Sequence, residues 1–363
     1  MKAAVLRDFG AALGIEDLQL TPPQGSELRV RIHACAICHS DITFIDGGWG
    51  GQLPAVFGHE AAGVVEEIGP ECQGLKIGDH VVVTLIRHCG HCLDCLDTGP
   101  WLCGEEHALN HRPVLLDPQQ NMVHQGLRTG AFAEEAVVDQ SQVVKIPHDI
   151  PMDAASLLAC GVITGLGAVT RTAAMPVGSR CAVIGLGGVG LNCVQGAVLN
   201  GARQIIGIDA SDSKMPVGMA FGCTDTMNVK NTDDPAAAVK ALTQGRGVDY
   251  VFVAVGAKSA MQSAAAMLRP GGTMVMVGMP ATGVDLCLDA ADFASASYSL
   301  IGSKMGSTHP QRDIPALVDL YQQGRLKLDE LISNRFPLED INQAIDEVKK
   351  GHVLRNVLIL GDK

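Results

Sequence analysis

The sequence predicts an α/β fold, with a doubly wound parallel sheet in the middle of the chain and a mostly β domain before it. Three observations support this prediction. Residues 156–303 alternate short β-branched runs with helical segments. Residues 1–155 are rich in Gly, Pro and Val and hold short strand-like runs, and residues 304–363 return to helix and a final strand. A chain of 363 residues is long enough for two domains.

The expected elements follow from the apolar pattern, taken in order along the chain. In the first stretch, strand-like runs cover residues 28–33, 63–68 and 80–83. In the middle stretch they cover 180–184, 205–208, 248–253, 273–277 and 299–302, with helical segments between them. The last stretch carries helical patterns over 314–323 and 342–349, then a strand over 356–360. Strands that alternate with helices are typical of a doubly wound sheet.

Four cysteines lie within 15 residues, in the segment CGHCLDCLDTGPWLC: Cys89, Cys92, Cys95 and Cys103. Four thiolates at this spacing can converge on one tetrahedral ion, and zinc is the usual occupant of such a site. A shell of four sulfurs leaves no open position, so this zinc would be structural. The alternative is a pair of disulfides or four unrelated thiols.

A second potential metal site combines Cys38 in CHSD, His59 in GHE and Cys160 in ACGVITG. Two thiolates and one imidazole would leave a fourth zinc position for water or substrate. A lone cysteine is more often a small buried hydrophobic residue, however. Spacing alone does not bring Cys160 next to Cys38, so the residues by themselves leave this site open.

A nucleotide-binding pattern follows in CAVIGLGGVG, where a β-branched run leads into Gly185, Gly187 and Gly190. Glycines at a strand-to-helix turn allow the backbone to approach a pyrophosphate at the helix N-terminus. The next strand-like run ends at Asp209, whose carboxylate can bind the adenosine ribose hydroxyls and repels a 2′-phosphate. The pattern therefore favours NAD over NADP, the alternative being a glycine-rich turn without a ligand.

Composition excludes some partners. A net charge of −12 argues against binding nucleic acid or an anionic membrane surface. The uncharged stretch 181–202 coincides with the nucleotide pattern, so we interpret it as a buried strand and helix rather than a membrane span. The chain has 12 cysteines and begins MKAAVLRDFG, which does not look like an export signal. We therefore expect a reducing, cytoplasmic location.

With these motifs in order, the chain resembles the zinc-containing medium-chain alcohol dehydrogenases, essentially from end to end. The resemblance implies a GroES-like, zinc-binding catalytic domain over residues 1–155 and 304–363, and an NAD-binding Rossmann domain over 156–303. It also implies a ligand set for each of two zinc ions per chain. The catalytic zinc would be bound by Cys38, His59 and Cys160, and the structural zinc by Cys89, Cys92, Cys95 and Cys103.

The resemblance implies further roles by position. Asp41 would orient the ligand histidine, Glu60 would lie behind the zinc, and Ser40 would take the substrate proton. The residues that would contact the cofactor, beside the three glycines, are His39, Thr164, Val189, Asp209, Lys214 and Arg355. An apolar substrate pocket would be lined by Trp49, Leu85, Leu127 and Met305.

The expected activity is reversible hydride transfer between an alcohol and NAD, giving an aldehyde or ketone, with zinc as the Lewis acid. We expect a homodimer, with a tetramer as the alternative. Two other functions stay open: an S-(hydroxymethyl)glutathione (formaldehyde) dehydrogenase of the same fold, and a non-enzymatic, zinc-stabilised nucleotide sensor. The glutathione adduct would require cations at the pocket mouth, where the chain has Trp49 and His107. The sequence does not name the alcohol or the physiological direction.

Two local features complete the prediction. His107, His111 and His124 lie in the long connection 104–130, where a solvated loop is favoured over a further metal site. Many members of the family carry a histidine five residues after the first zinc-ligand cysteine, which relays the proton to solvent. This chain has Thr43 there, and a threonine cannot act as a base near neutral pH. We therefore expect a shortened proton route.

Overall fold

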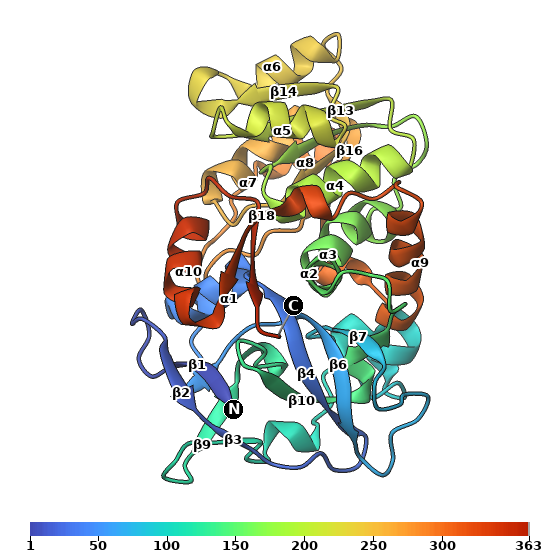
Figure 1. Ribbon diagram of the computed structural model, residues 1–363. Coiled ribbons are helices and arrows are strands. Elements are labelled where there is room, and N and C mark those ends of the chain that lie inside the picture. The colour runs from blue at the N-terminus through green and yellow to red at the C-terminus, as the bar shows by residue number, and fades with distance from the viewer. Residues whose placement is uncertain (362–363) are drawn as a thin grey trace. The chain divides into compact units, whose positions relative to one another are not determined.

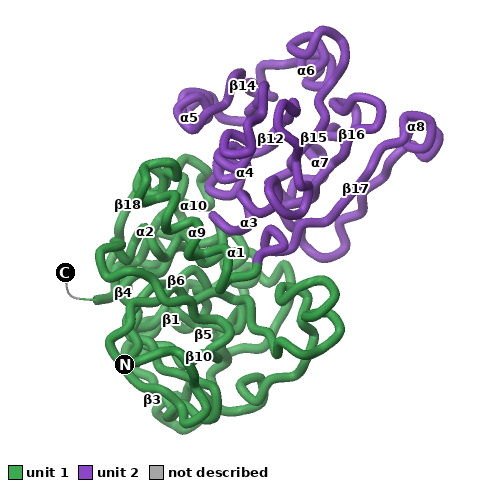
Figure 2. The backbone as a smooth tube through the Cα atoms, turned by 90° about the vertical axis from the view of Figure 1, so that its right-hand side faces the viewer, with its two compact units in different colours: residues 1–161, 309–363 green, residues 162–308 purple. Residues whose placement is uncertain are grey.

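The computed structural model describes residues 1–361, which separate into two compact units (Figure 2). Unit 1 comprises Met1–Gly161 together with the chain from His309 onward, and unit 2 comprises Val162–Thr308. The sequence predicted breaks near residues 155 and 303. The roles that it assigned to the two domains stay a prediction.

Unit 1 is built on two sheets. The first has the strand order β2 (Gly14–Asp17), β1 (Lys2–Leu6), β5 (Ala55–Val56), β9 (Met122–Gln125), β8 (Leu115–Leu116), β3 (Gln19–Leu20). The second has the order β11 (Val143–Lys145), β7 (His80–Val83), β6 (Glu60–Ile68), β4 (Glu27–Ala36), β19 (Arg355–Ile359), β18 (Ile332–Pro337), and β10 (Glu135–Asp139) also pairs with β4.

The two chain segments of unit 1 share the second sheet. Strand β19, near the end of the chain, pairs antiparallel with β4, with Val357 opposite Ala36 and Leu358 opposite Cys35 (Figure 1). Alternate residues of β4, among them Leu28, Val30 and Ile32, are fully buried in the unit's core. The helices of unit 1 are α1 (His39–Ile45), α2 (Met152–Leu157), α9 (Pro310–Gln322) and α10 (Ile341–Lys349).

Unit 2 contains one parallel sheet with helices between successive strands. Its order is β14 (Asp225–Asn228), β13 (Gln204–Asp209), β12 (Arg180–Ile184), β15 (Val248–Val253), β16 (Leu268–Met276), β17 (Ser299–Gly302). This order, with β12 near the centre and the strands running outward on both sides, is that of a dinucleotide-binding doubly wound sheet. The predicted fold class is therefore confirmed. The helices are α3 (Gly161–Gly167), α4 (Gly188–Leu199), α5 (Lys214–Phe221), α6 (Pro235–Leu242), α7 (Lys258–Ala264) and α8 (Ala290–Ser295).

Burial explains the local patterns of unit 2. Strand β12 is buried after its first residue, and most residues of α4 are buried. This burial accounts for the absence of charged residues over 181–202, the stretch that contains both elements. Strand β16 begins at Leu268, earlier than the predicted strand at Thr273. Its first five residues are LRPGG, and proline and glycine normally indicate that a strand is interrupted.

Candidate metal and nucleotide sites

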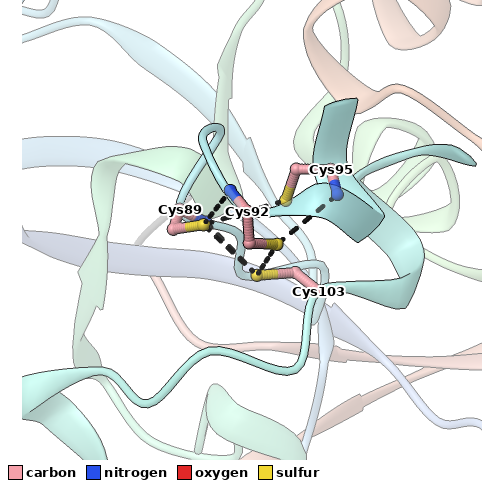
Figure 3. A group of neighbouring side chains, drawn as sticks. All are labelled: Cys89, Cys92, Cys95 and Cys103. Carbon is pink, nitrogen blue, oxygen red and sulfur yellow. Dashed lines mark hydrogen bonds between the residues drawn. The ribbon is translucent and has the colours of Figure 1, made fainter. Parts of the chain in front are cut away.

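The four-cysteine loop lies in unit 1 between β7 and β8, and Figure 3 shows its four side chains turned toward one another. All four sulfurs lie within 4.8 Å of one another. The Sγ–Sγ distances are 3.8 Å for Cys89–Cys103, 3.9 Å for Cys89–Cys95 and 4.0 Å for Cys92–Cys103. The thiols are free, so the disulfide alternative is wrong.

These distances match a tetrahedral zinc site. Zn–S bonds of about 2.3 Å in a tetrahedron place the sulfurs about 3.8 Å apart. Backbone N–H groups also point at the sulfurs: those of Cys92 and His91 donate to Cys89 Sγ, and that of Cys95 donates to Cys92 Sγ. Such hydrogen bonds stabilise thiolates. The residues present therefore fit the predicted ion.

The second cluster gathers Cys38, His59 and Cys160, with Glu60 beside them, and every member is buried. Cys38 is the N-cap of α1, His59 directly precedes β6, and Cys160 follows α2. One ligand atom from each residue lies within 4.8 Å of the others. The structure thus brings together three segments that are far apart in the sequence, including Cys160, which spacing alone did not place.

Gly58 allows this convergence. Its backbone has φ of +90°, a conformation that costs glycine little, and a Cβ there would lie 2.6 Å from the backbone nitrogen of Phe132. A larger residue at position 58 would therefore have to displace the chain that positions His59.

Asp41 fixes the orientation of His59 from a fully buried position. Its Oδ1 accepts hydrogen bonds from the His59 Nδ1–H and from the Gly58 N–H, both at 2.9 Å, and its Oδ2 accepts from the Cys38 N–H at 3.1 Å. A carboxylate on Nδ1 leaves Nε2 as the lone-pair nitrogen. Among the described residues, the buried Nε2 has no hydrogen-bond partner.

The thiols of this cluster are polarised. The hydrogen bond between the Cys38 and Cys160 side chains lowers the pKa of Cys38 well below its usual value, although burial opposes this shift. The same hydrogen bond, together with burial, raises the pKa of Cys160. The lowered pKa of Cys38 favours its thiolate, the form that binds metal. Burial raises the pKa of Glu60 to about 8, against the nearby charge of Arg355. A buried imidazole nitrogen without a partner, together with two sulfurs, fits a zinc ion with one open position.

Of the other predicted residues of unit 1, Arg355 contacts this cluster directly. Ser40 is half-buried on the first turn of α1, next to the exposed His39. Arg355 is buried, and its Nη2 lies 3.3 Å from Glu60 Oε1 while its Nη1 donates to the Ile37 carbonyl. The sequence reasoning assigned Arg355 to the cofactor and missed this pairing with Glu60. Trp49, Leu85 and Leu127 are partly buried.

The glycine turn in unit 2 connects β12 to α4. A Cβ on Gly190 would lie 1.6 Å from the Gly185 carbonyl oxygen, so this helix packs against the turn only with glycine. A Cβ on Gly187, the N-cap of α4, would meet no atom within 4 Å. The helix N-terminus is therefore open at Gly187, where a phosphate would approach.

The remaining cofactor candidates are also in unit 2. Asp209 ends β13, and its Oδ2 accepts a hydrogen bond from the Leu186 N–H at 2.7 Å, so its carboxylate adjoins the glycine turn. Burial lowers the pKa of Lys214, although the charge of Asp209 opposes this effect. The Thr164 hydroxyl donates to the Met305 sulfur at 3.8 Å, and Val189 is half-buried in the first turn of α4.

The three histidines of segment 104–130 do not converge. His111 pairs with Glu106 at 3.1 Å on the surface, and His124 lies on β9. Within residues 1–361 the two clusters above are the groups of three or more potential ligands that could hold a metal. None of the helices in this part of the chain combines the length and apolar character that a membrane span requires.

Comparison with known proteins identifies the family. The alcohol dehydrogenase GroES-like domain matches residues 24–148, and the zinc-binding dehydrogenase domain matches residues 188–323. Alcohol dehydrogenase-like 1 of Arabidopsis thaliana is 38% identical over 370 residues, which cover 98% of this chain and 95% of that protein.

Two crystal structures are similar over 99% of both chains. An alcohol dehydrogenase zinc-binding domain protein from Burkholderia ambifaria is 35% identical with a TM-score of 0.94. Benzyl alcohol dehydrogenase from Acinetobacter calcoaceticus is 32% identical with a TM-score of 0.92. The resemblance seen in the sequence is confirmed: this chain belongs to the zinc-containing medium-chain alcohol dehydrogenase family of oxidoreductases.

Proposed function

We propose that this protein is a zinc- and NAD-dependent alcohol dehydrogenase that binds two zinc ions per chain. The observation that carries the proposal is the buried His59 Nε2, which has no hydrogen-bond partner among residues 1–361 and lies within reach of the Cys38 and Cys160 sulfurs. A structural metal would need a fourth protein ligand. Cys38, His59 and Cys160 leave one position for water or substrate, provided that Glu60, which lies within the same 4.8 Å, stays paired with Arg355.

The residues around the site have distinct roles in this proposal. Zinc supplies a Lewis acid for the alcohol oxygen, and NAD supplies the hydride acceptor. Asp41 keeps His59 in the tautomer that presents Nε2, and Ser40 takes the hydroxyl proton of the alcohol. Burial of all three ligands excludes water from the sulfur side of the site. The carbonyl product forms as its carbon loses the hydride.

The preference for NAD rests on Asp209. Its Oδ1 accepts hydrogen bonds from the Ala210 and Ser211 N–H groups at 2.7 and 3.1 Å, and Oδ2 accepts from Leu186. These bonds hold the carboxylate at the end of β13. A 2′-phosphate at the ribose would meet this negative charge, whereas a ribose hydroxyl can donate to it.

The test is NADH formation by the zinc-loaded protein with a panel of primary and secondary alcohols, with NADP in place of NAD as the comparison. Formaldehyde with glutathione provides the test for the adduct dehydrogenase. Turnover of simple alcohols with NAD supports the proposal. Turnover of the glutathione adduct alone would replace it with that alternative. Tight NAD binding without turnover of any alcohol would leave the nucleotide sensor.

We expect a homodimer because β17 is an edge strand. Among residues 1–361 it pairs on one side only, with β16, and its residues are mostly exposed. A large apolar side chain is exposed on it, that of Leu300 at 41%. An exposed edge that carries an apolar side chain can pair with a second copy. Light scattering should give a dimer that Leu300→Lys dissociates, and a monomeric wild type would contradict this expectation.

A further inference from the structure

A cavity of about 290 Å³ in unit 1 carries a charge opposite to that of the whole protein. Among the described residues, two arginines line it, Arg87 and Arg128, and no Asp or Glu does, although the net charge of the chain is −12. An engineered cavity of about 150 Å³ holds benzene, so this cavity has room for a ring with a charged substituent.

Arg87 is 2% exposed and has only neutral partners for its charge. Its Nε donates to Gln142 Oε1 at 2.7 Å, its Nη1 to Asn110 Oδ1 at 2.8 Å, and its Nη2 to the Arg128 carbonyl at 2.7 Å. One N–H on each terminal nitrogen is left over. Burial, and then the like charge of Arg128, lowers the pKa of Arg87 to about 10, so it is still cationic at neutral pH.

Arg128 owes its position to an unusual turn. Leu127 and Arg128 have φ of 51° and 63°, two successive left-handed residues that are not glycine. Such conformations cost free energy and persist where surrounding contacts hold them. Here the Arg128 carbonyl accepts hydrogen bonds from Arg87 and from Gln142 Nε2. Gly126 lets the turn lie on Phe57, whose ring a Cβ would meet at 2.3 Å.

The nearest acidic side chains are engaged outside the cavity. Asp139 accepts hydrogen bonds from Ser26 and Ser141, Glu27 pairs with Arg112, and Glu106 pairs with His111. Within residues 1–361, neither arginine that lines the cavity forms an ion pair. Arg128 is exposed, whereas Arg87 is buried. A buried cation such as Arg87 that lacks an ion partner is costly unless an anion joins it.

The rest of the cavity wall combines neutral polar side chains and His124 with an apolar part, and it shares Leu127 with the predicted substrate pocket. Phe57, two residues before His59, stacks on Phe44 with ring centroids 5.9 Å apart, and Trp49 packs edge-on against Phe44 at 5.1 Å. Leu127, predicted to line the substrate pocket, lines this cavity as well. Its other apolar residues are Ala55, Leu109 and Met122.

We infer that this cavity binds the carboxylate of the substrate, and that the substrates are aromatic or similarly apolar alcohols and aldehydes with a carboxylate remote from the reacting carbon. The aromatic walls bind the ring, and Arg87 and Arg128 bind the carboxylate with charge-assisted hydrogen bonds. This inference rests on the proposed function, because it gives the substrate class of that enzyme.

The test compares 4-(hydroxymethyl)benzoate with benzyl alcohol, which share the ring and the hydroxyl. The wild type should show a kcat/KM for the carboxylate at least about tenfold higher, the contribution of one charge-assisted hydrogen bond. Arg128→Gln should remove most of that ratio, Arg128→Lys should keep part of it, and Arg128→Glu should reverse it. Arg128 is chosen because its side chain forms no hydrogen bond or ion pair among residues 1–361.

Arg325→Gln is the matched control, since it removes the same charge from an exposed position far along the chain. It should leave the ratio unchanged. A wild type without preference for the carboxylate, or an Arg128→Gln variant with the wild-type ratio, would overturn the inference while alcohol oxidation still supported the proposed function.

A binding measurement distinguishes failure of the anion subsite from failure of the proposed alcohol dehydrogenase function. Titration calorimetry with 4-(hydroxymethyl)benzoate should show binding that weakens about tenfold in Arg128→Gln. If neither alcohol is oxidised but this binding and its dependence on Arg128 are found, the anion subsite holds and the proposed function fails. If the compound does not bind, the subsite is wrong.

Discussion

Asp41→Asn is the sharpest perturbation of the proposed catalytic zinc site, because it changes one buried atom. The asparagine carbonyl can keep the two hydrogen bonds from His59 Nδ1 and Gly58 N–H. Its NH2 group would then face the Cys38 N–H, which now donates to Oδ2 at 3.1 Å. Two donors would meet, and the negative charge that strengthens His59 as a ligand would be lost.

The magnitude follows from these contacts. Leaving the buried Cys38 N–H without an acceptor costs about 1–3 kcal/mol of folding free energy. Loss of the carboxylate behind a ligand histidine typically costs about 10–100-fold in metal affinity or activity. We therefore expect Asp41→Asn to unfold at a lower temperature and to release its catalytic zinc to a chelator at a concentration about 10–100-fold lower.

Asp46→Asn is the matched control on the same helix. Asp46 is exposed and pairs with Lys349 at 2.7 Å on the surface, a contact worth about 0–1 kcal/mol. The assay is zinc content after equilibration against a graded chelator, with kcat/KM and thermal unfolding measured on the same samples. Equal zinc retention by Asp41→Asn and Asp46→Asn would refute the role assigned to Asp41.

Four further outcomes follow from single contacts. Asp209→Gly should reduce the NAD-over-NADP ratio of kcat/KM by at least about tenfold, and an unchanged ratio would show that Asp209 does not face the ribose. Gly190→Ala, with a Cβ 1.6 Å from the Gly185 oxygen, should lose NAD binding in calorimetry; wild-type affinity would contradict the fingerprint. The Thr43 hydroxyl donates to the His39 carbonyl at 2.9 Å. An imidazole at this position can accept the proton, so Thr43→His should speed single-turnover oxidation below about pH 8 where proton release limits the rate. Superimposable pH profiles would remove Thr43 from the proton route or show that another step is slow. Burial, and then the charge of His148, lowers the pKa of His80 in the folded state. The folded protein therefore favours the neutral imidazole. Stability is fully present above the unfolded pKa of about 6.5 and decreases as the pH falls below that value. His80→Gln should therefore reduce the fall in melting temperature between about pH 7.5 and 5.5, and equal slopes for both proteins would refute the assignment.

Much of the fold could be predicted because its signals are local. The strands Arg180–Ile184 and Val248–Val253 have the predicted bounds, since both are buried β-branched runs with turns at their ends. The four-cysteine site was predictable for the same reason, as its ligands lie within one short loop. Strand β16 was recognised only in part because LRPGG lacks the apolar alternation of a strand.

The catalytic cluster could not be derived from spacing alone. Cys160 approaches Cys38 only through the packing of α2 onto the second sheet, and the sequence supplied it through the family resemblance. The cationic cavity was not predicted at all. The two left-handed positions are Leu127 and Arg128 rather than glycine or asparagine, so the flanking Gly126 does not reveal their conformation. Arg87 looks like a surface residue in the sequence until its burial is known.

Zinc content, measured with activity on the same freshly purified protein, tests the central claim most directly. The account predicts a ratio near two zinc ions per chain in the wild type. Cys38→Ser should have a ratio near one and lose alcohol oxidation while it still binds NAD, because the four-cysteine site and the glycine turn are untouched. A wild-type ratio near one, or a Cys38→Ser variant that oxidises alcohols at the wild-type rate, would contradict the account.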